Sequence, residues 1–132
     1  MADLTITETN ISTDEITEVG EAGEQITAGM PVYLAAATGL LMKAINSSAA
    51  ASAVKGISVN RAESGQPVNY IPAGNLNMGA ILTTGLIYVA SSTAGKISPA
   101  TDNGSGEFVS VLGVATSTSV LKVGLLNSGV AV

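Results

Sequence analysis

Short runs of β-forming residues, separated by turn residues at regular intervals, are the feature that most restricts the fold of this chain. Val, Ile, Leu and Tyr gather in these runs, and Gly, Pro, Asn and Ser lie between them. β-Branched and aromatic residues favour strands, whereas Gly, Pro and Asn favour reversals of the chain. The pattern predicts an all-β fold. The expected strands are Pro31–Leu34, Leu40–Ala44, Val54–Val59, Pro67–Ile71, Gly79–Thr83, Leu86–Ala90, Lys96–Ser98, Phe108–Ala115 and Val120–Leu126.

The length of 132 residues corresponds to one compact unit of β-structure. We expect a small β-barrel or sandwich of about eight or nine short strands. Several of these strands are nearly continuous apolar runs, which is typical of strands covered on both faces. One face would then meet the core, and the other would meet a second sheet or another subunit.

Three segments of the first half are similar to three segments of the second half, in the same order. Met30–Leu34 resembles Gly85–Val89, Lys55–Val59 resembles Leu112–Thr116, and Pro67–Ile71 resembles Lys122–Leu126. The displacement is 55 to 57 residues in each case. The order predicts two related β-units, and chance similarity among glycine- and valine-rich strands is the alternative.

Charge divides the chain into an acidic N-terminal arm, residues 1–22, and a β-rich domain, residues 23–132. Residues 1–42 carry a formal charge of −7, and all five basic residues follow them. The arm has few apolar residues, so it cannot form a core of its own. It is either a disordered tail or an extended arm that becomes ordered by adding to a neighbouring sheet or surface. In the second case the residues that contact the neighbouring molecule or subunit would be Leu4, Ile6, Ile11, Ile16 and Val19.

Several classes of function conflict with the composition. The chain has no Cys and no His, which excludes disulfides, thiol nucleophiles, His-based triads and Cys/His zinc sites within one chain. Five basic residues are too few for a phosphate-binding surface, so we expect no nucleic acid as partner. The long uncharged stretch between Glu63 and Lys96 contains prolines and glycines, and the N-terminus lacks the pattern of a signal peptide. We therefore expect no membrane association.

Catalytic and metal sites find little support in the β-rich domain. Its only carboxylates in residues 43–132 are Glu63, Asp102 and Glu107. Asp102 and Glu107 flank a glycine-rich turn, but the few aromatic residues count against a glycosidase. The same turn lacks the alternating acidic positions of a calcium loop. The sequence therefore predicts neither an enzyme, nor a cofactor, nor a metal site.

Apolar residues are more numerous than a small single core requires. Hydrophobic residues make up 46% of the chain and charged residues 11%, and the mean hydropathy is +0.45. Monomeric proteins rarely expose large apolar patches. We therefore expect part of this apolar surface to be buried between subunits of a homo-oligomer.

A family resemblance covers about residues 22–126. It begins with Ala22–Leu34, in which Gly29 precedes Met-Pro-Val-Tyr-Leu, and continues through Lys55–Val59, Glu63–Val68 and Gly85–Val89. In this order the segments resemble small capsid decoration (cement) proteins of tailed bacteriophages.

The resemblance implies a β-rich, often trimeric domain on the outer surface of the virion head. Such a protein binds the major capsid protein, bridges neighbouring capsid subunits and stabilises the capsid against the pressure of the packaged DNA. It implies no catalytic residues and no cofactor. The alternative is the base or shaft domain of a phage head fibre or tail appendage, because glycine-rich β-repeats and trimerisation fit that role too.

Overall fold

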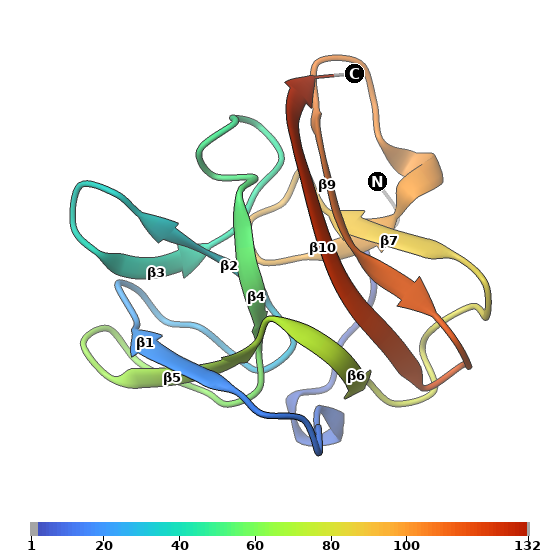
Figure 1. The fold of residues 1–132 in the computed structure, drawn as a ribbon, viewed down its shortest axis with the longest axis horizontal. Helices are drawn as coiled ribbons and strands as arrows, with labels where there is room; N and C mark the ends of the chain where they lie inside the picture. Colours follow the sequence, from blue (N-terminus) through green and yellow to red (C-terminus); the bar gives the residue numbers. More distant parts are fainter. Residues whose placement is uncertain (1–2, 132) are drawn as a thin grey trace.

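The computed structural model describes residues 3–131 and consists of two five-stranded antiparallel sheets (Figure 1). We call them the N-terminal and the C-terminal sheet. The N-terminal sheet contains β1 (Glu18–Glu21), β2 (Pro31–Ala35), β3 (Leu40–Lys43), β4 (Val54–Ser58) and β5 (Pro67–Ile71). The C-terminal sheet contains β6 (Ala73–Asn77), β7 (Ile87–Ala90), β8 (Ile97–Pro99), β9 (Phe108–Ala115) and β10 (Val120–Ala131). Two short 3₁₀ turns, η1 (Glu8–Asn10) and η2 (Ala100–Asp102), complete the secondary structure.

The two sheets have the same topology. The strand order is β1-β5-β4-β2-β3 in the first and β6-β10-β9-β7-β8 in the second, so each strand number rises by five. Val32 pairs with Gly56 and Tyr88 with Gly113, and a register shift follows directly in both sheets. The predicted repeat is therefore confirmed for strand order and for the two glycines. The predicted match of Tyr33 with Tyr88 is one residue out of place, because Val32 holds the equivalent position.

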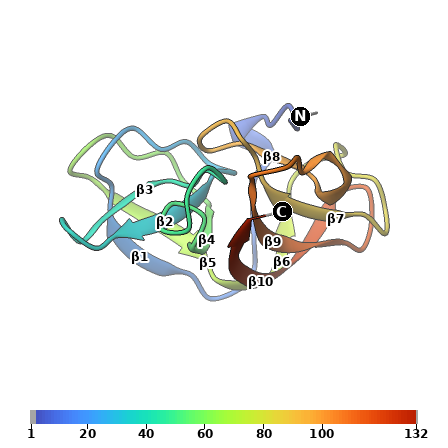
Figure 2. The same cartoon turned by 90° about the horizontal axis from the view of Figure 1, so that it is seen from above.

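Two hydrophobic clusters form the core. The smaller one lies within the N-terminal sheet, and its buried members are Ala22, Ile26, Val32, Leu41, Ala62, Val68 and Tyr70. The larger one takes Ile57 and Ile71 from the N-terminal sheet and Tyr88, Leu112 and Leu121 from the C-terminal sheet. The sheets lie side by side when seen from above (Figure 2). The strands form two separate sheets around a shared core and not one closed sheet, so the all-β fold is consistent with the sandwich and not with a closed barrel.

Most expected strands are present, but the strand expected at Gly79–Thr83 is wrong. This segment is a turn, in which Gly79 has a φ of +77° and the Leu82 amide donates to the Thr118 carbonyl. Leu82 is buried without pairing in a sheet, which accounts for the misleading apolar pattern. β1 and β6 were not expected, because Glu-Val-Gly-Glu and Ala-Gly-Asn-Leu-Asn contain few β-forming residues.

The described part of the N-terminal arm, residues 3–22, lies along both sheets of its own chain, and we call it the leader. The Leu4 amide donates to the Ile97 carbonyl of β8 at 2.8 Å, and Ser12 forms a bridge with Asn77 of β6. Further on, β1 pairs with β5 at the edge of the N-terminal sheet. The leader therefore connects the two sheets by backbone hydrogen bonds.

The Asn127 side chain forms a second connection between the sheets. Its Oδ1 accepts a hydrogen bond from the Val54 amide at 3.2 Å, and its Nδ2 donates to the Val54 carbonyl at 3.1 Å. The Ser110 hydroxyl also donates to Oδ1 at 2.7 Å. An amide side chain on β10 thus takes the place of a pairing strand beside the first residue of β4.

Gly113 permits the close approach of β9 and β10, which predicts a sharp difference between two glycine substitutions. A Cβ atom at Gly113 would lie 2.2 Å from the Lys122 carbonyl oxygen, whereas one at Gly124 would meet nothing within 4 Å. We expect Gly113→Ala to lower the free energy of unfolding by about 1–3 kcal/mol or more, because the backbone of β10 must shift. Urea denaturation measures this, and Gly124→Ala is the matched control. Equal effects of the two substitutions would contradict the role given to Gly113.

Asn127→Ala should destabilise the chain, because the Val54 amide and carbonyl both lose their side-chain partner. The expected loss is about 1–3 kcal/mol in the free energy of unfolding. Asn127→Asp keeps the acceptor and loses the donor to the Val54 carbonyl, so it separates the two hydrogen bonds. Thermal and urea denaturation of both variants test this connection. Unchanged stability of Asn127→Ala would show that water replaces it without cost.

Candidate interaction surface

Two carboxylates of the β-rich domain, Glu107 and Glu63, bond to groups of their own chain. The Glu107 carboxylate accepts a hydrogen bond from the Gly104 amide at 2.7 Å and so caps the turn before β9. Glu63 lies 3.4 Å from Arg61 and also accepts hydrogen bonds from the Gln25 amide group. Within residues 3–131, no group of three or more Asp, Glu, His or Cys side chains is placed to hold a metal ion.

A polar hollow of about 240 Å³ lies where the leader meets β6. The Thr13 hydroxyl donates to the Asn75 carbonyl at 2.6 Å, and the Glu15 carboxylate accepts a hydrogen bond from the Asn75 amide at 3.2 Å. These polar groups hold the leader to the edge of the C-terminal sheet. The hollow is thus the seam between two segments of one chain.

The five leader residues expected to contact the capsid or another subunit fall into two groups. Leu4 and Ile6 are half-buried and pack against the larger core, and Ile11 is buried in it. Ile16 is 90% exposed and Val19 is 63% exposed. Only Ile16 and Val19 therefore present most of their side chain to the outside of this chain.

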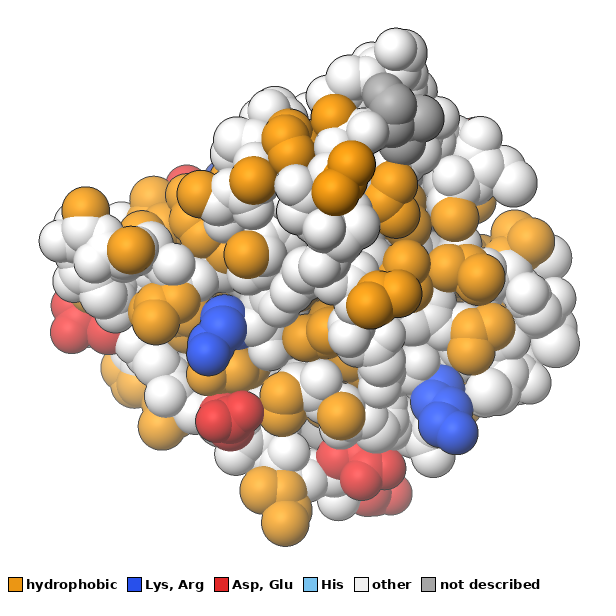
Figure 3. Space-filling model, turned by 45° about the horizontal axis from the view of Figure 1, so that its top comes forward, with side chains coloured by type: hydrophobic (Ala, Val, Ile, Leu, Met, Phe, Trp, Pro, Cys, Tyr) orange, Lys and Arg blue, Asp and Glu red, His pale blue; other side chains and the backbone are white. Residues whose placement is uncertain are grey.

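Other large apolar side chains are exposed on the C-terminal sheet. Ile87 on β7 and Leu126 and Val130 on β10 each expose close to half of their surface or more. Figure 3 shows hydrophobic side chains spread over one face of the molecule, with few charged groups among them. The continuous apolar runs in the sequence predicted strands covered on both faces, but they did not single out these residues.

A groove of about 370 Å³ lies on the outer face of β7, β9 and β10. We call it the β9 groove. Its lining residues are Ile87, Val111, Gly113, Val114, Lys122, Val123 and Gly124. It is an apolar depression with one cation at its margin.

Among residues 3–131, ion pairs join two of the five basic residues to carboxylates. Arg61 lies 3.1 Å from Glu8 and 3.4 Å from Glu63, and Lys43 lies 3.7 Å from Glu24. In the part of the chain that the structure describes, Lys122 has no carboxylate within 4.0 Å. The cation beside the β9 groove is therefore free of an ion pair there.

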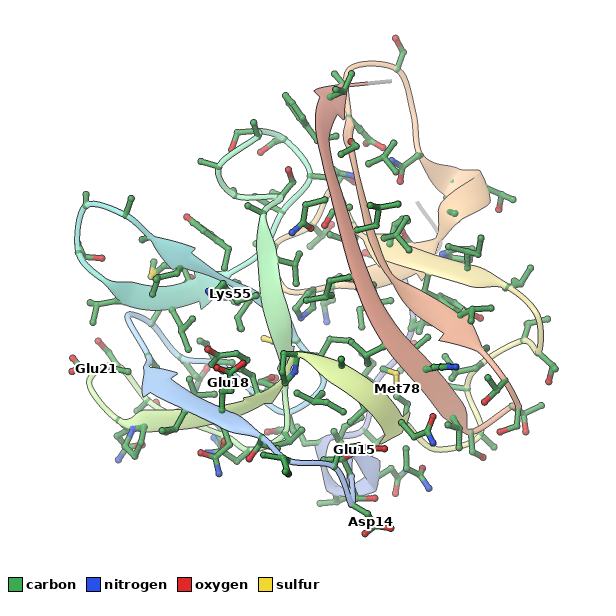
Figure 4. All side chains as sticks on the ribbon, in the orientation of Figure 1. Asp14, Glu15, Glu18, Glu21, Lys55 and Met78 are labelled. Atoms are coloured by element: carbon green, nitrogen blue, oxygen red, sulfur yellow. The ribbon has the colours of Figure 1, made fainter. Side chains whose placement is uncertain are left out.

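Exposed carboxylates gather around β1. Figure 4 shows Asp14 and Glu15 in the turn before β1, and Glu18 and Glu21 on β1 itself. Ile16 and Val19 lie between them in the sequence. The surface around β1 thus combines exposed aliphatic side chains with negative charge.

The described residues contain no helix that is long and apolar enough to cross a membrane. In comparisons with known proteins, no family model and no curated protein matches the chain.

Tyr70 provides a test of the packing between β1 and β5 through its pKa. Burial raises the pKa of the Tyr70 phenol above its ordinary value of 10.0, and the nearby Glu18 carboxylate adds to the rise. The folded state therefore holds the phenolic proton more tightly than the unfolded state does. The resulting stability is present below pH 10 and is lost as the pH rises through the pKa of the folded state.

We expect the free energy of unfolding to fall more steeply above about pH 10 in the unmodified chain than in Tyr70→Phe. Urea denaturation between neutral pH and pH 11 measures the two profiles. Parallel profiles would show that Tyr70 titrates alike in the folded and unfolded states.

Proposed function

We propose that this protein is a structural component of a tailed-phage head that binds the outer surface of the capsid and bridges major capsid subunits. In this role it acts as a homotrimer, needs no cofactor, catalyses no reaction and contacts neither nucleic acid nor membrane. The resemblance of residues 22–126 to capsid decoration proteins supports the proposal. The surface supports it too, because several large aliphatic side chains are exposed there.

The exposed apolar side chains are the observation that carries the proposal. These exposed side chains, Ile16, Val19, Ile87, Leu126 and Val130, are spread over β7, β10 and the region of β1 instead of lining one small pocket. Burial of one such side chain contributes roughly 1.5–3 kcal/mol. A few of them at one contact give only moderate affinity, but an oligomer that contacts several capsid subunits at once gains from avidity.

The position of the leader refines the mechanism. Leu4, Ile6 and Ile11 stabilise the chain's own core, so contacts to other molecules are left to Ile16 and Val19. The carboxylates next to them would meet basic groups of a capsid or of another subunit. Such charge pairs orient the approach of the partners and add specificity.

Cosedimentation of the full chain with purified mature heads that lack it tests the proposal. We expect saturable binding at many copies per head and a higher temperature of capsid disruption. A matched sample of unexpanded heads is the control for the mature surface. Saturation at a few copies per head would favour the base of a fibre, and no binding above that of an unrelated protein would overturn the proposal.

A further inference from the structure

The repeat allows the outer faces of the two sheets to be compared position by position. Ile57 on β4 pairs with Pro31 on one side and with Ile71 on the other. Val114 on β9 pairs in the same way with Ile87 and Lys122. The trio Pro31, Ile57 and Ile71 in the N-terminal sheet therefore corresponds to Ile87, Val114 and Lys122 in the C-terminal sheet.

The two trios differ in what covers them. Pro31 is buried, and Ile57 and Ile71 are fully buried in the core that the two sheets share. Ile87 is 47% exposed, Val114 is half-buried and Lys122 is exposed, and together they line the β9 groove. The surface that is covered in the first unit is thus open in the second.

The chemistry of the β9 groove indicates what would cover it. Lys122 stands where the covered trio has Ile71, so the partner should offer a carboxylate as well as aliphatic side chains. The segment Asp14–Val19 of this same chain offers both, with Ile16 and Val19 exposed among Asp14, Glu15 and Glu18. In its own chain this region is tied to β5 and β6. Its Ile16 and Val19 side chains nevertheless stay exposed, so they are available to a second copy.

We propose that the β9 groove binds the Asp14–Val19 segment of a second copy of this chain. Ile16 and Val19 pack against Ile87 and Val114, and a carboxylate of the segment lies beside Lys122. The contact is heterologous, because the segment of one copy occupies the groove of the next copy, so repetition gives a ring or a chain of copies. This inference rests on the self-association in the proposed function and identifies its interface.

Two single substitutions test the two halves of the contact. Ile16→Asp removes the apolar anchor of the segment, and Ile87→Asp places a carboxylate in the groove. Each should weaken self-association at least about tenfold in sedimentation equilibrium. Leu34→Asp on β2, which is 46% exposed and belongs to neither half, is the matched control. Far-UV circular dichroism and urea denaturation show that each variant is folded.

Mixing the two variants gives the sharpest result. A copy with Ile16→Asp keeps an intact groove, and a copy with Ile87→Asp keeps an intact segment. An equimolar mixture should therefore form one-to-one dimers and nothing larger. A mixture that stays monomeric would overturn the proposal, and so would an Ile87→Asp variant that assembles like the unmodified chain.

The experiment uses purified protein without capsids, so its outcome is independent of capsid binding. An Ile87→Asp variant that keeps its oligomeric state but no longer cosediments with heads would assign the β9 groove to the capsid. In that case the present inference fails while the proposed function stands. If instead the variants and their mixture associate as predicted but the unmodified chain does not bind heads, the present inference stands and the proposed function fails.

Discussion

The burial of the outer face of β4 against the C-terminal sheet is the contact on which the rest of the structure depends. Val54 and Ile57 of β4 lie in the same cluster as Leu112 of β9 and Val123 of β10. Each sheet alone is a short five-stranded unit whose outer face would be left in water. Sharing one core removes that face for the N-terminal sheet, and the Asn127 side chain supplies the polar partners that the end of β4 needs.

The leader strengthens this arrangement and carries much of the negative charge of the chain. It is hydrogen-bonded to β8, β6 and β5 in turn, so it connects the two sheets along one side. Its apolar residues form two successive groups, because those up to Ile11 pack on the core, whereas Ile16 and Val19 lie in solvent. Because the charged groups gather around Ile16 and Val19, the same segment that ties the sheets together carries the most acidic surface of the chain.

Much of the fold could be predicted from the sequence because strand formation here follows local composition. The expected strands are rich in β-forming residues, and all of them except Gly79–Thr83 overlap strands of the structure. β1 and β6 form because a neighbouring strand offers hydrogen bonds, and local composition does not report that. The matching of Ile71 with Lys122 depends on sheet register, which a comparison of short similar segments misplaces by several residues.

The sequence predicted that an exposed apolar surface exists, but not which residues form it. An excess of apolar residues indicated that some would lie outside the core, but which ones did so depends on the packing of the two sheets. Leu4, Ile6, Ile16 and Val19 are similar in sequence context, and only the folded chain separates the first two from the last two. The β9 groove lies on residues from three strands, so no single segment of the sequence marks it.

The central claim is that the uncovered outer face of the C-terminal sheet makes this chain associate with further copies of itself. Sedimentation equilibrium of the unmodified chain across micromolar concentrations tests it most directly. The account predicts a mass that rises with concentration to a multiple of the 13.1 kDa chain. A single species of 13.1 kDa at every concentration would contradict it.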